Sequence, residues 1–253
     1  MADSGQDPWF VRAFDAGYLA RYAHRDRAEA DATIAWLTGS GLVRADGPVL
    51  DLCCGAGRHG SALAKRGFTV HGFDLSRDLL HHARSTTLDA GRPVRLVRGS
   101  MDALPFRDAA FATCIHMFTA FGYFARDEHN RSVLREVART LRPGSRYVLD
   151  LFNGPLIVAQ LVPESTTTRD TTTVREARAF DASTRRLEKT IEITHDDGHV
   201  DRRFESVRVL DVDEGTRWLC DAGFHDVRVF GDYAGGPYDV DASPRLVFIA
   251  KRA

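Results

Sequence analysis

The amino-acid sequence predicts an α/β fold with an antiparallel β insertion and a helical N-terminal segment. Three observations lead to this class. The segment Val49–Asp74 has the pattern of a strand, a glycine turn, a helix and a second strand that closes on an acid. Strand and helix patterns then alternate as far as Phe152, which is typical of a parallel sheet. Between residues 172 and 210, three stretches follow the two-residue period of strands.

Length and composition limit what the chain does. Its 253 residues suffice for one large domain or for one domain with an insertion. The net charge of −1 gives no electrostatic footprint for nucleic acid or for an anionic membrane. The 4 cysteines form no CxxC pair and no Cys/His cluster, so we expect reduced thiols, no metal and a cytoplasmic location. No apolar run approaches the ~20 residues of a membrane helix, and no signal peptide is evident.

Residues 8–37 are predicted to be helical, with a bend at residues 22–26. Pro8 can start a helix, and a helix resumes at Glu29–Leu37. Aromatic side chains recur at three- and four-residue spacing: Trp9, Phe10, Phe14, Tyr18 and Tyr22. Such a stripe packs on the body of the protein, or it closes over a ligand and supplies tyrosine hydroxyls.

The glycine turn after the first strand is the strongest candidate for a binding site. The strand Val49–Cys54 leads into glycines 55, 57 and 60, and a helix and the strand Phe68–Phe73 follow. Glycines let the backbone approach a ligand, and a helix N-terminus offers amide donors to it. Asp74 ends the second strand, where a carboxylate accepts both hydroxyls of an adenosine ribose.

The spacing of these glycines also matches the G-x-G-x-x-G motif of nicotinamide and flavin enzymes. Asp51 argues against that class, because its carboxylate lies on the strand four residues before Gly55 and would repel a pyrophosphate. The same carboxylate suits a ligand that brings a cation. The Tyr-x-x-x-Lys pair of many such oxidoreductases is also missing.

An aromatic segment, Thr119–Phe124, continues the predicted strand Phe111–Phe118. Loops at the carboxyl ends of strands bind ligands in open α/β sheets. Its rings can wall an apolar pocket and favour an adjacent cation, although we expect about half of them to belong to the core. Upstream, we expect a helix at Arg77–Ala90, a strand at Val94–Arg98 and a loop at Gly99–Phe106.

The second half of the chain contains the predicted insertion. A helix at Asp127–Leu141 and a strand at Tyr147–Phe152 precede it, and Glu164–Thr173 has the composition of a flexible connector. The inserted strands are predicted at Thr172–Phe180, Arg186–Thr194 and Val200–Leu210, with a hairpin signal at residues 196–198. A helix at Asp213–Ala222 and strands at Val227–Phe230 and Arg245–Ala250 complete the chain.

The pattern D-x-x-x-G-x-G at residues 51–57 resembles the first motif of class I S-adenosylmethionine (SAM) dependent methyltransferases. The segments CCGxGRHxxxLAxRG, FTxFGYF and LRPGxRxxLDLFN resemble bacterial small-molecule N-methyltransferases that act on antibiotics and aminosugars. This resemblance extends over roughly 47–153 and 211–251. It implies a Rossmann-like seven-stranded sheet with its last strand antiparallel. It also implies SAM as cofactor, S-adenosylhomocysteine as product, and a small-molecule acceptor.

The same resemblance divides the chain into parts. Residues 1–46 would form a helical lid, residues 47–163 and 211–253 the SAM-binding core, and residues 164–210 the inserted sheet. Whether that sheet caps the site, forms the subunit interface of a homo-oligomer, or does both is left open by the sequence.

Site residues follow from matching positions. The cofactor side comprises Tyr22, Asp51, Gly55, Gly57, Arg58, Asp74, Leu75, Met101, Asp102 and Met117. Arg58 and Tyr22 would bind the methionine carboxylate, Asp74 the ribose, and Met101 and Asp102 the adenine. On the acceptor side we expect catalytic roles for Tyr18, Phe118 and Tyr123 and substrate contacts from Phe10, Asn153 and Tyr233.

The chemistry of the acceptor stays open between nitrogen and oxygen. A neutral amine needs no strong base, whereas a hydroxyl benefits from one, usually His. His116 lies inside a predicted strand, so we expect it in the core and favour N-methylation. Nucleic-acid methylation is disfavoured, because neither a [DN]-P-P-[YFW] sequence nor a Pro-Cys dipeptide is present. An O-methyltransferase and a non-catalytic SAM-binding protein are the remaining alternatives.

Overall fold

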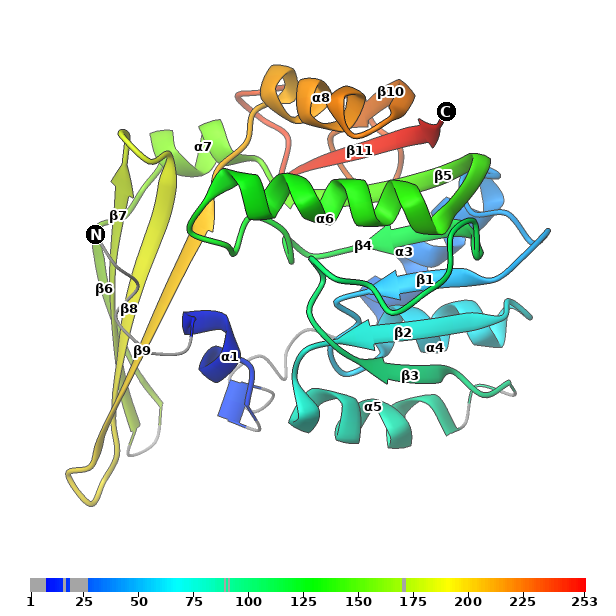
Figure 1. Cartoon of the computed structure of the whole chain (residues 1–253). Helices are drawn as coiled ribbons and strands as arrows, with labels where there is room; N and C mark the ends of the chain where they lie inside the picture. The colour runs from blue at the N-terminus through cyan, green and yellow to red at the C-terminus, as the bar shows by residue number, and fades with distance from the viewer. Residues whose placement is uncertain (1–7, 16, 19–26, 89, 91, 170–171) are drawn as a thin grey trace.

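A seven-stranded sheet forms the core of the computed structural model, which describes residues 8–15, 17–18, 27–88, 90, 92–169 and 172–253. Its strand order is β10-β11-β5-β4-β1-β2-β3 (Figure 1). β11 is the reversed strand, antiparallel to both β5 and β10, while the pairs among the other strands are parallel. The strands are β1 (Val49–Leu52), β2 (Val70–Asp74), β3 (Arg95–Arg98), β4 (Phe111–His116), β5 (Leu141–Phe152), β10 (Phe224–Phe230) and β11 (Arg245–Arg252).

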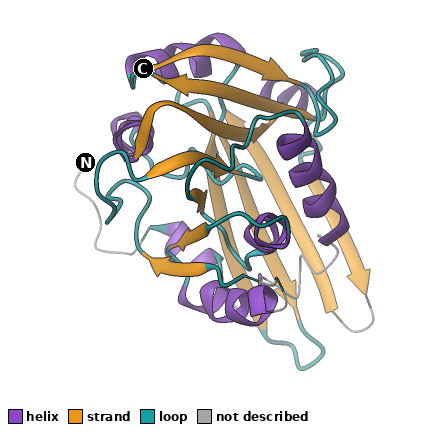
Figure 2. Cartoon of the chain, turned by 90° about the vertical axis from the view of Figure 1, so that its right-hand side faces the viewer, coloured by secondary structure: helices purple, strands orange, loops and turns teal. Residues whose placement is uncertain are grey.

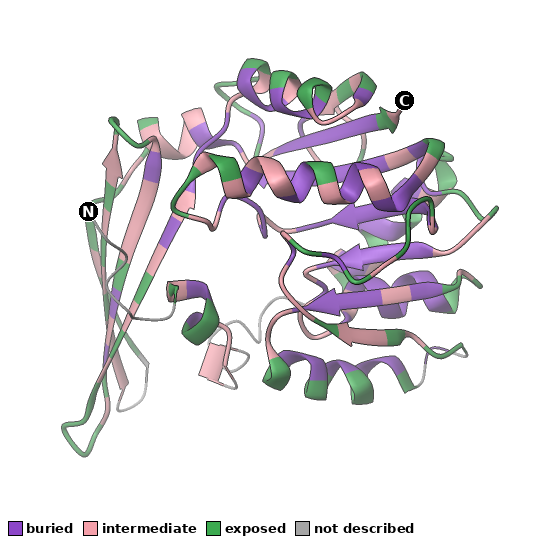
Figure 3. Ribbon diagram, in the orientation of Figure 1, coloured by how far each residue is buried: buried purple, intermediate pink, exposed green. Residues whose placement is uncertain are grey.

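Helices cover both faces of this sheet (Figures 1 and 2). They are α3 (Arg27–Gly39), α4 (Arg58–Lys65), α5 (Arg77–Leu88), α6 (Asp127–Thr140) and α8 (Val212–Asp221), whereas the short α7 (Gly154–Ala159) lies beyond the end of β5 (Figure 1). One apolar cluster joins α6 and α8 to the sheet, and a second joins α3 and α4 to the opposite face. The central strands β1 and β4 are buried throughout, as expected for strands covered on both sides (Figure 3). The predicted fold class is confirmed.

A second, antiparallel sheet stands apart from the core, at the left of Figure 1 and behind the core in Figure 2. It consists of β6 (Glu164–Arg169), β7 (Thr172–Asp181), β8 (Arg186–Thr194) and β9 (Val200–Arg208). The prediction of a flexible connector over Glu164–Thr173 was wrong. Its threonines are β-branched and favour strands, and residues 164–169 pair along their whole length with β7.

β5 and the segment that follows it also differ from the predictions. β5 begins at Leu141, directly after α6, because Leu141 already pairs with Phe111 of β4. The unpredicted helix α7 follows Asn153, whose side-chain oxygen accepts a hydrogen bond from the Leu156 amide as an N-cap. Pro155 sits in the first turn of that helix, where its missing N–H costs nothing.

The N-terminal segment is described in part. Helix α1 (Trp9–Ala13) lies between the inserted sheet and the core sheet (Figure 1). Tyr22 lies outside the described residues, so its predicted role has no structural counterpart. In the described part of the chain, no helix has the length and apolar character to cross a membrane.

Candidate active site

A cavity opens at the carboxyl ends of β1, β2 and β4, where the glycine turn meets helix α1. The structure brings ten of the predicted site residues to its wall: Phe10, Tyr18, Gly55, Arg58, Asp74, Leu75, Met101, Met117, Phe118 and Tyr123. Phe14 of the aromatic stripe and Phe124 of the aromatic segment also line it, as do Cys53, His59 and Ser100, to which the sequence prediction gave no role. Five predicted residues do not line it: Asp51, Gly57, Asp102, Asn153 and Tyr233.

Asp74 is held with its carboxylate at the cavity. One oxygen accepts the Gly55 amide and the other accepts the Ser76 amide, both at 2.8 Å. Each carboxylate oxygen has about two acceptor sites, so one on each remains for a ligand hydroxyl. Burial raises the pKa of Asp74, and the two backbone amides counteract that rise. The geometry suits recognition of a vicinal diol such as a ribose.

The two glycines of the turn have different environments. A Cβ on Gly55 would meet only Leu79, at 3.8 Å, so its backbone is open toward the cavity. A Cβ on Gly57 would lie 3.1 Å from Ala83 and 3.2 Å from Thr87 of α5. Both have left-handed backbone, with φ of 53° and 79°. Gly55 therefore allows a ligand to approach, whereas Gly57 allows α4 and α5 to pack.

Asp51 lies behind the turn and not at the cavity surface. It is 1% exposed, and its Oδ2 has no hydrogen-bond partner among the described residues. Burial, with a smaller contribution from the nearby Asp74 charge, raises the pKa of Asp51 to about 7. The prediction that Asp51 lies on the first strand is confirmed, but the sequence did not show that its carboxylate is buried beneath the glycine turn.

A left-handed corner follows β4. Phe118 and Thr119 have φ of 64° and 57°, which is unfavourable for residues with a side chain. Asp150 of β5 stabilises the corner, because its carboxylate accepts the Phe118 amide at 2.6 Å and its carbonyl accepts the Thr119 amide at 2.9 Å. Arg245 of β11 pairs with the same carboxylate through Nε and Nη2, each at 2.8 Å.

Two guanidinium groups lie close to the Phe118 ring. The guanidinium of Arg58 is 4.7 Å from the ring centroid and that of Arg245 is 5.4 Å from it. Arg58 also pairs through Nη1 with Glu29 of α3, at 2.8 Å. The aromatic ring and this ion pair fix Arg58 at the cavity wall, where its remaining donors can meet an anionic ligand group.

Another part of the cavity wall is aromatic and joins distant segments. The Tyr123 ring centroid lies 4.9 Å from that of Trp9, 5.6 Å from Phe14 and 6.2 Å from Phe10. Burial raises the pKa of the Tyr123 phenol well above its ordinary value, so it stays protonated near neutral pH. It can orient an acceptor by hydrogen bonding, but it is a poor proton acceptor.

Two predicted acceptor residues, Asn153 and Tyr233, instead support the loop after β10. The Asn153 amide donates to carbonyls of that loop, including those of Val240 and Ser243 at 2.9 Å, and accepts the Tyr238 hydroxyl at 2.8 Å. The Tyr233 hydroxyl donates to Asp150 at 2.7 Å. Asn153 follows β5 and Tyr233 lies in the loop after β10, as predicted, but both are outside the cavity wall.

Asp102 also lies outside the cavity wall. Ser100 donates to one of its carboxylate oxygens, and His129 lies 3.6 Å from the other. Its neighbours Ser100 and Met101 do line the cavity. The loop therefore faces the cavity through residues 99–101.

His59, which lines the cavity, and His116, which is buried at the end of β4, are weak bases. His116 is fully buried, with Nε2 3.0 Å from the Ala120 carbonyl and Nδ1 2.9 Å from the Tyr147 hydroxyl. A carbonyl only accepts, so the proton lies on Nε2. Burial lowers the pKa of His116 to about 4 and that of His59 to about 3. His116 has the core role that the sequence predicted.

Comparison with known proteins agrees with this geometry. The model of a family described as a methyltransferase domain matches residues 49–144. A dTDP-3-amino-3,4,6-trideoxy-alpha-D-glucopyranose N,N-dimethyltransferase of Streptomyces venezuelae is 32% identical over 138 residues, which is 54% of this chain and 54% of that protein. The chain thus spans about half the length of this curated relative.

Two solved structures share the fold. The CcbJ methyltransferase from Streptomyces caelestis has a TM-score of 0.76 at 22% identity, covering 88% of this chain and 96% of its own. CalS10, an amino pentose methyltransferase from Micromonospora echinaspora solved with SAM bound, has a TM-score of 0.65 at 21% identity, covering 94% and 97%. The matched model thus places a methyltransferase domain at residues 49–144, and the solved methyltransferases share the fold of nearly the whole chain.

Proposed function

We propose that the protein transfers a methyl group from SAM to the amine nitrogen of a small molecule. The observation that carries this proposal is one cavity with two halves. We assign the glycine turn and Asp74 to a cofactor half, and the aromatic rings from α1 and from residues 118–124, which line the same cavity, to an acceptor wall. A cofactor with a ribose and a sulfonium fits the first half, and an apolar, water-excluding wall suits the second.

Each residue of the cofactor half has an assigned part in this proposal. Asp74 accepts the ribose hydroxyls, and the open backbone of Gly55 lets the ligand lie against the turn. Leu75 and Met101 flank the adenine, Arg58 binds the methionine carboxylate, and Met117 meets the amino group. When bound, SAM supplies an electrophilic methyl on a positive sulfur, so the protein mainly provides orientation and a dry site.

The acceptor is proposed to be an amine because His59, the histidine that lines the described cavity, is a poor base, as is the buried His116. An uncharged amine attacks with its own lone pair, the S–CH3 bond breaks as the N–CH3 bond forms, and the resulting ammonium releases its proton to water. A hydroxyl acceptor would need a base with a pKa near neutral, and His59 and His116 lie far below that. Relatives named for aminosugar and amino pentose methylation agree with this choice.

Replacing Asp74 with Ala is expected to weaken SAM binding by about 1–3 kcal/mol, which is roughly a 5- to 150-fold rise in Kd. The variant removes the acceptors of the ribose hydroxyls and frees the Gly55 amide. Titration calorimetry measures the change directly. Asp78→Ala, an exposed acid on the next helix, is the control and should bind as wild type does. Equal affinities for wild type and the Asp74 variant would remove the ribose assignment.

Replacing Tyr123 with Phe is expected to slow methyl transfer by about tenfold, the value of one hydrogen bond, with SAM affinity unchanged. The ring packing against Trp9 and Phe14 is retained, so only the hydroxyl is tested. The assay supplies methyl-labelled SAM with an extract that contains small amines, aminosugars, RNA and protein. Label in RNA or protein would overturn the small-molecule acceptor.

A further inference from the structure

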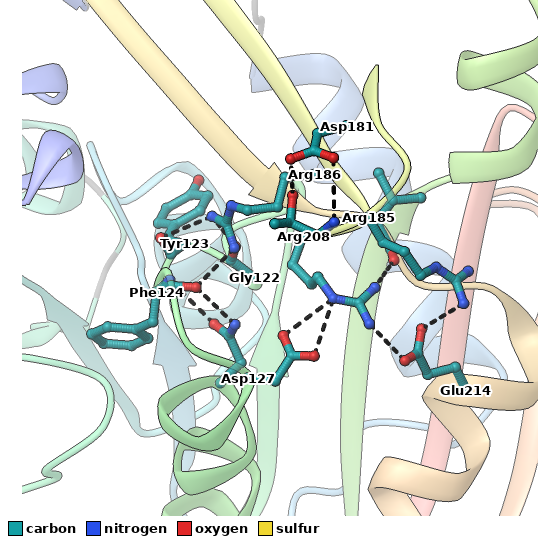
Figure 4. Close-up of polar contacts among 12 residues, drawn as sticks. Gly122, Tyr123, Phe124, Asp127, Asp181, Arg185, Arg186, Arg208 and Glu214 are labelled. Carbon is teal, nitrogen blue, oxygen red and sulfur yellow. Dashed lines mark hydrogen bonds and ion pairs between the residues drawn. The ribbon is translucent and has the colours of Figure 1, made fainter. Parts of the chain in front are cut away.

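Arg186, at the start of β8 in the inserted sheet, reaches the core loop that lines the cavity. Its guanidinium donates through Nη1 to the Phe124 carbonyl at 2.9 Å. Nη2 donates to the carbonyls of Gly122 at 3.1 Å and Tyr123 at 3.2 Å. Figure 4 shows this side chain directed at three consecutive carbonyls of the loop. One arginine therefore fixes the backbone on which the Tyr123 and Phe124 rings are mounted.

The other bonds of Arg186 anchor it within its own sheet. Nε donates to the Ser206 hydroxyl at 2.8 Å, and Nη2 donates to the Ser206 carbonyl at 2.6 Å. The residue is 6% exposed, and its hydrogen bonds within the described chain all go to carbonyl or hydroxyl oxygens, none to a carboxylate. A planar guanidinium serves several acceptors at fixed angles, which an ammonium does not. The hydrogen bonds of Arg186 therefore form only when the carbonyls of the loop hold these positions.

The loop and the inserted sheet also meet backbone to backbone. The Arg208 amide donates to the Gly122 carbonyl at 2.8 Å. Gly122 has φ of 86°, and a Cβ there would lie 2.8 Å from the Arg208 carbonyl oxygen. On the other side of the loop, Asn130 of α6 accepts the Phe124 amide at 3.2 Å and donates to its carbonyl at 2.9 Å. The loop is thus held between the core helix and the insertion.

We propose that Arg186 is a positioning residue that sets the acceptor wall of the cavity from the inserted sheet. This role rests on the proposed methyl transfer. In-line displacement requires the acceptor nitrogen, the methyl carbon and the sulfur to be aligned, and a displacement of about 1 Å costs on the order of a hundredfold in rate. Tyr123 and Phe124 belong to the acceptor wall, whereas Asp74 and Gly55 belong to the cofactor half. Loss of Arg186 therefore acts on the transfer step and not on SAM binding.

The test compares Arg186→Met with Arg185→Met. Arg185 is its chain neighbour, is 40% exposed and pairs with Asp211 at 2.7 Å and Glu214 at 3.2 Å, away from the loop (Figure 4). For Arg186→Met we expect kcat for labelled methyl transfer to fall by at least about tenfold, with the Kd for SAM changed by less than about threefold. Amide hydrogen exchange should rise at residues 122–126 and not at residues 49–57. Arg185→Met should change none of these quantities.

Arg186→Lys keeps the charge without the planar fork, so it should recover part of kcat and part of the exchange protection. It also carries the test if the Met variant does not fold. Unchanged exchange at residues 122–126, an unchanged kcat, or a Kd for SAM that rises as much as kcat falls would each overturn the positioning role. Wild-type protein that binds SAM but methylates no small molecule would count against the proposed function. The hydrogen-exchange comparison would still show whether Arg186 holds the loop at residues 122–126.

Discussion

Replacing Arg245 with Met is expected to lower the free energy of unfolding by about 3–5 kcal/mol, the cost of leaving a buried charge without its partner. Asp150 is fully buried on β5 and accepts two bonds from Arg245, together with bonds from the Phe118 amide and the Tyr233 hydroxyl. Without the guanidinium, the carboxylate keeps two donors and no countercharge. Urea denaturation measures the loss.

The matched control is Arg228→Met, which removes an exposed arginine from the neighbouring strand β10 and should leave stability unchanged. Adding Asp150→Asn to Arg245→Met should recover part of the loss, because the uncompensated charge is gone. If the double variant is less stable than Arg245→Met alone, the buried charge is not the cause of the destabilisation.

Replacing Asp51 with Asn is expected to stabilise the protein relative to wild type progressively between pH 4 and pH 7. The pKa of Asp51 is about 7 in the folded chain and 3.8 in the reference state, so the folded protein retains the proton over this range. The unfolded chain releases it, and wild type therefore loses about 1.4 kcal/mol per pH unit that the neutral Asn does not lose. The difference should be absent below pH 4 and level off above pH 7.

The measurement is the free energy of unfolding of both proteins across that pH range. Asp78→Asn, on the surface of α5, is the control and should follow the wild-type curve at every pH. A constant difference between wild type and Asp51→Asn from pH 4 to pH 8 would show that Asp51 does not take up a proton on folding.

Local patterns predicted part of the cavity wall. The strand, turn, helix and acid of residues 49–74 are contiguous, so Gly55 and Asp74 reach the cavity as the sequence indicated. Orientation was beyond such patterns. Asp51 and Gly57 belong to the same motif, yet neither lines the cavity. The Asp51 side chain is buried beneath the glycine turn, and Gly57 packs against α5. Strand periodicity predicts which face of the sheet a side chain lies on, but the residues around it come from elements that are distant in the sequence.

The long-range contacts left no local signal. Asp150 is an acid within an apolar run of β5, but nothing near it in the sequence indicates that its partner is Arg245, 95 residues later. Arg185 and Arg186 are adjacent and chemically identical, so only the three-dimensional structure shows which one holds the loop. The threonine run of β6 was interpreted as a connector because its polar composition outweighed its β-branching, and the pairing with β7 decides the outcome.

The most direct test of the central claim is to locate the transferred methyl group. SAM labelled with ¹³C in its methyl would be incubated with the protein and a mixture of small amines and sugars, and the products examined by NMR. We predict a new signal from a methyl bonded to nitrogen, strong with wild type and weakened by Tyr123→Phe. A signal from a methyl bonded to oxygen would contradict the amine acceptor, and a SAM signal that wild type leaves unchanged, despite binding, would contradict methyl transfer itself.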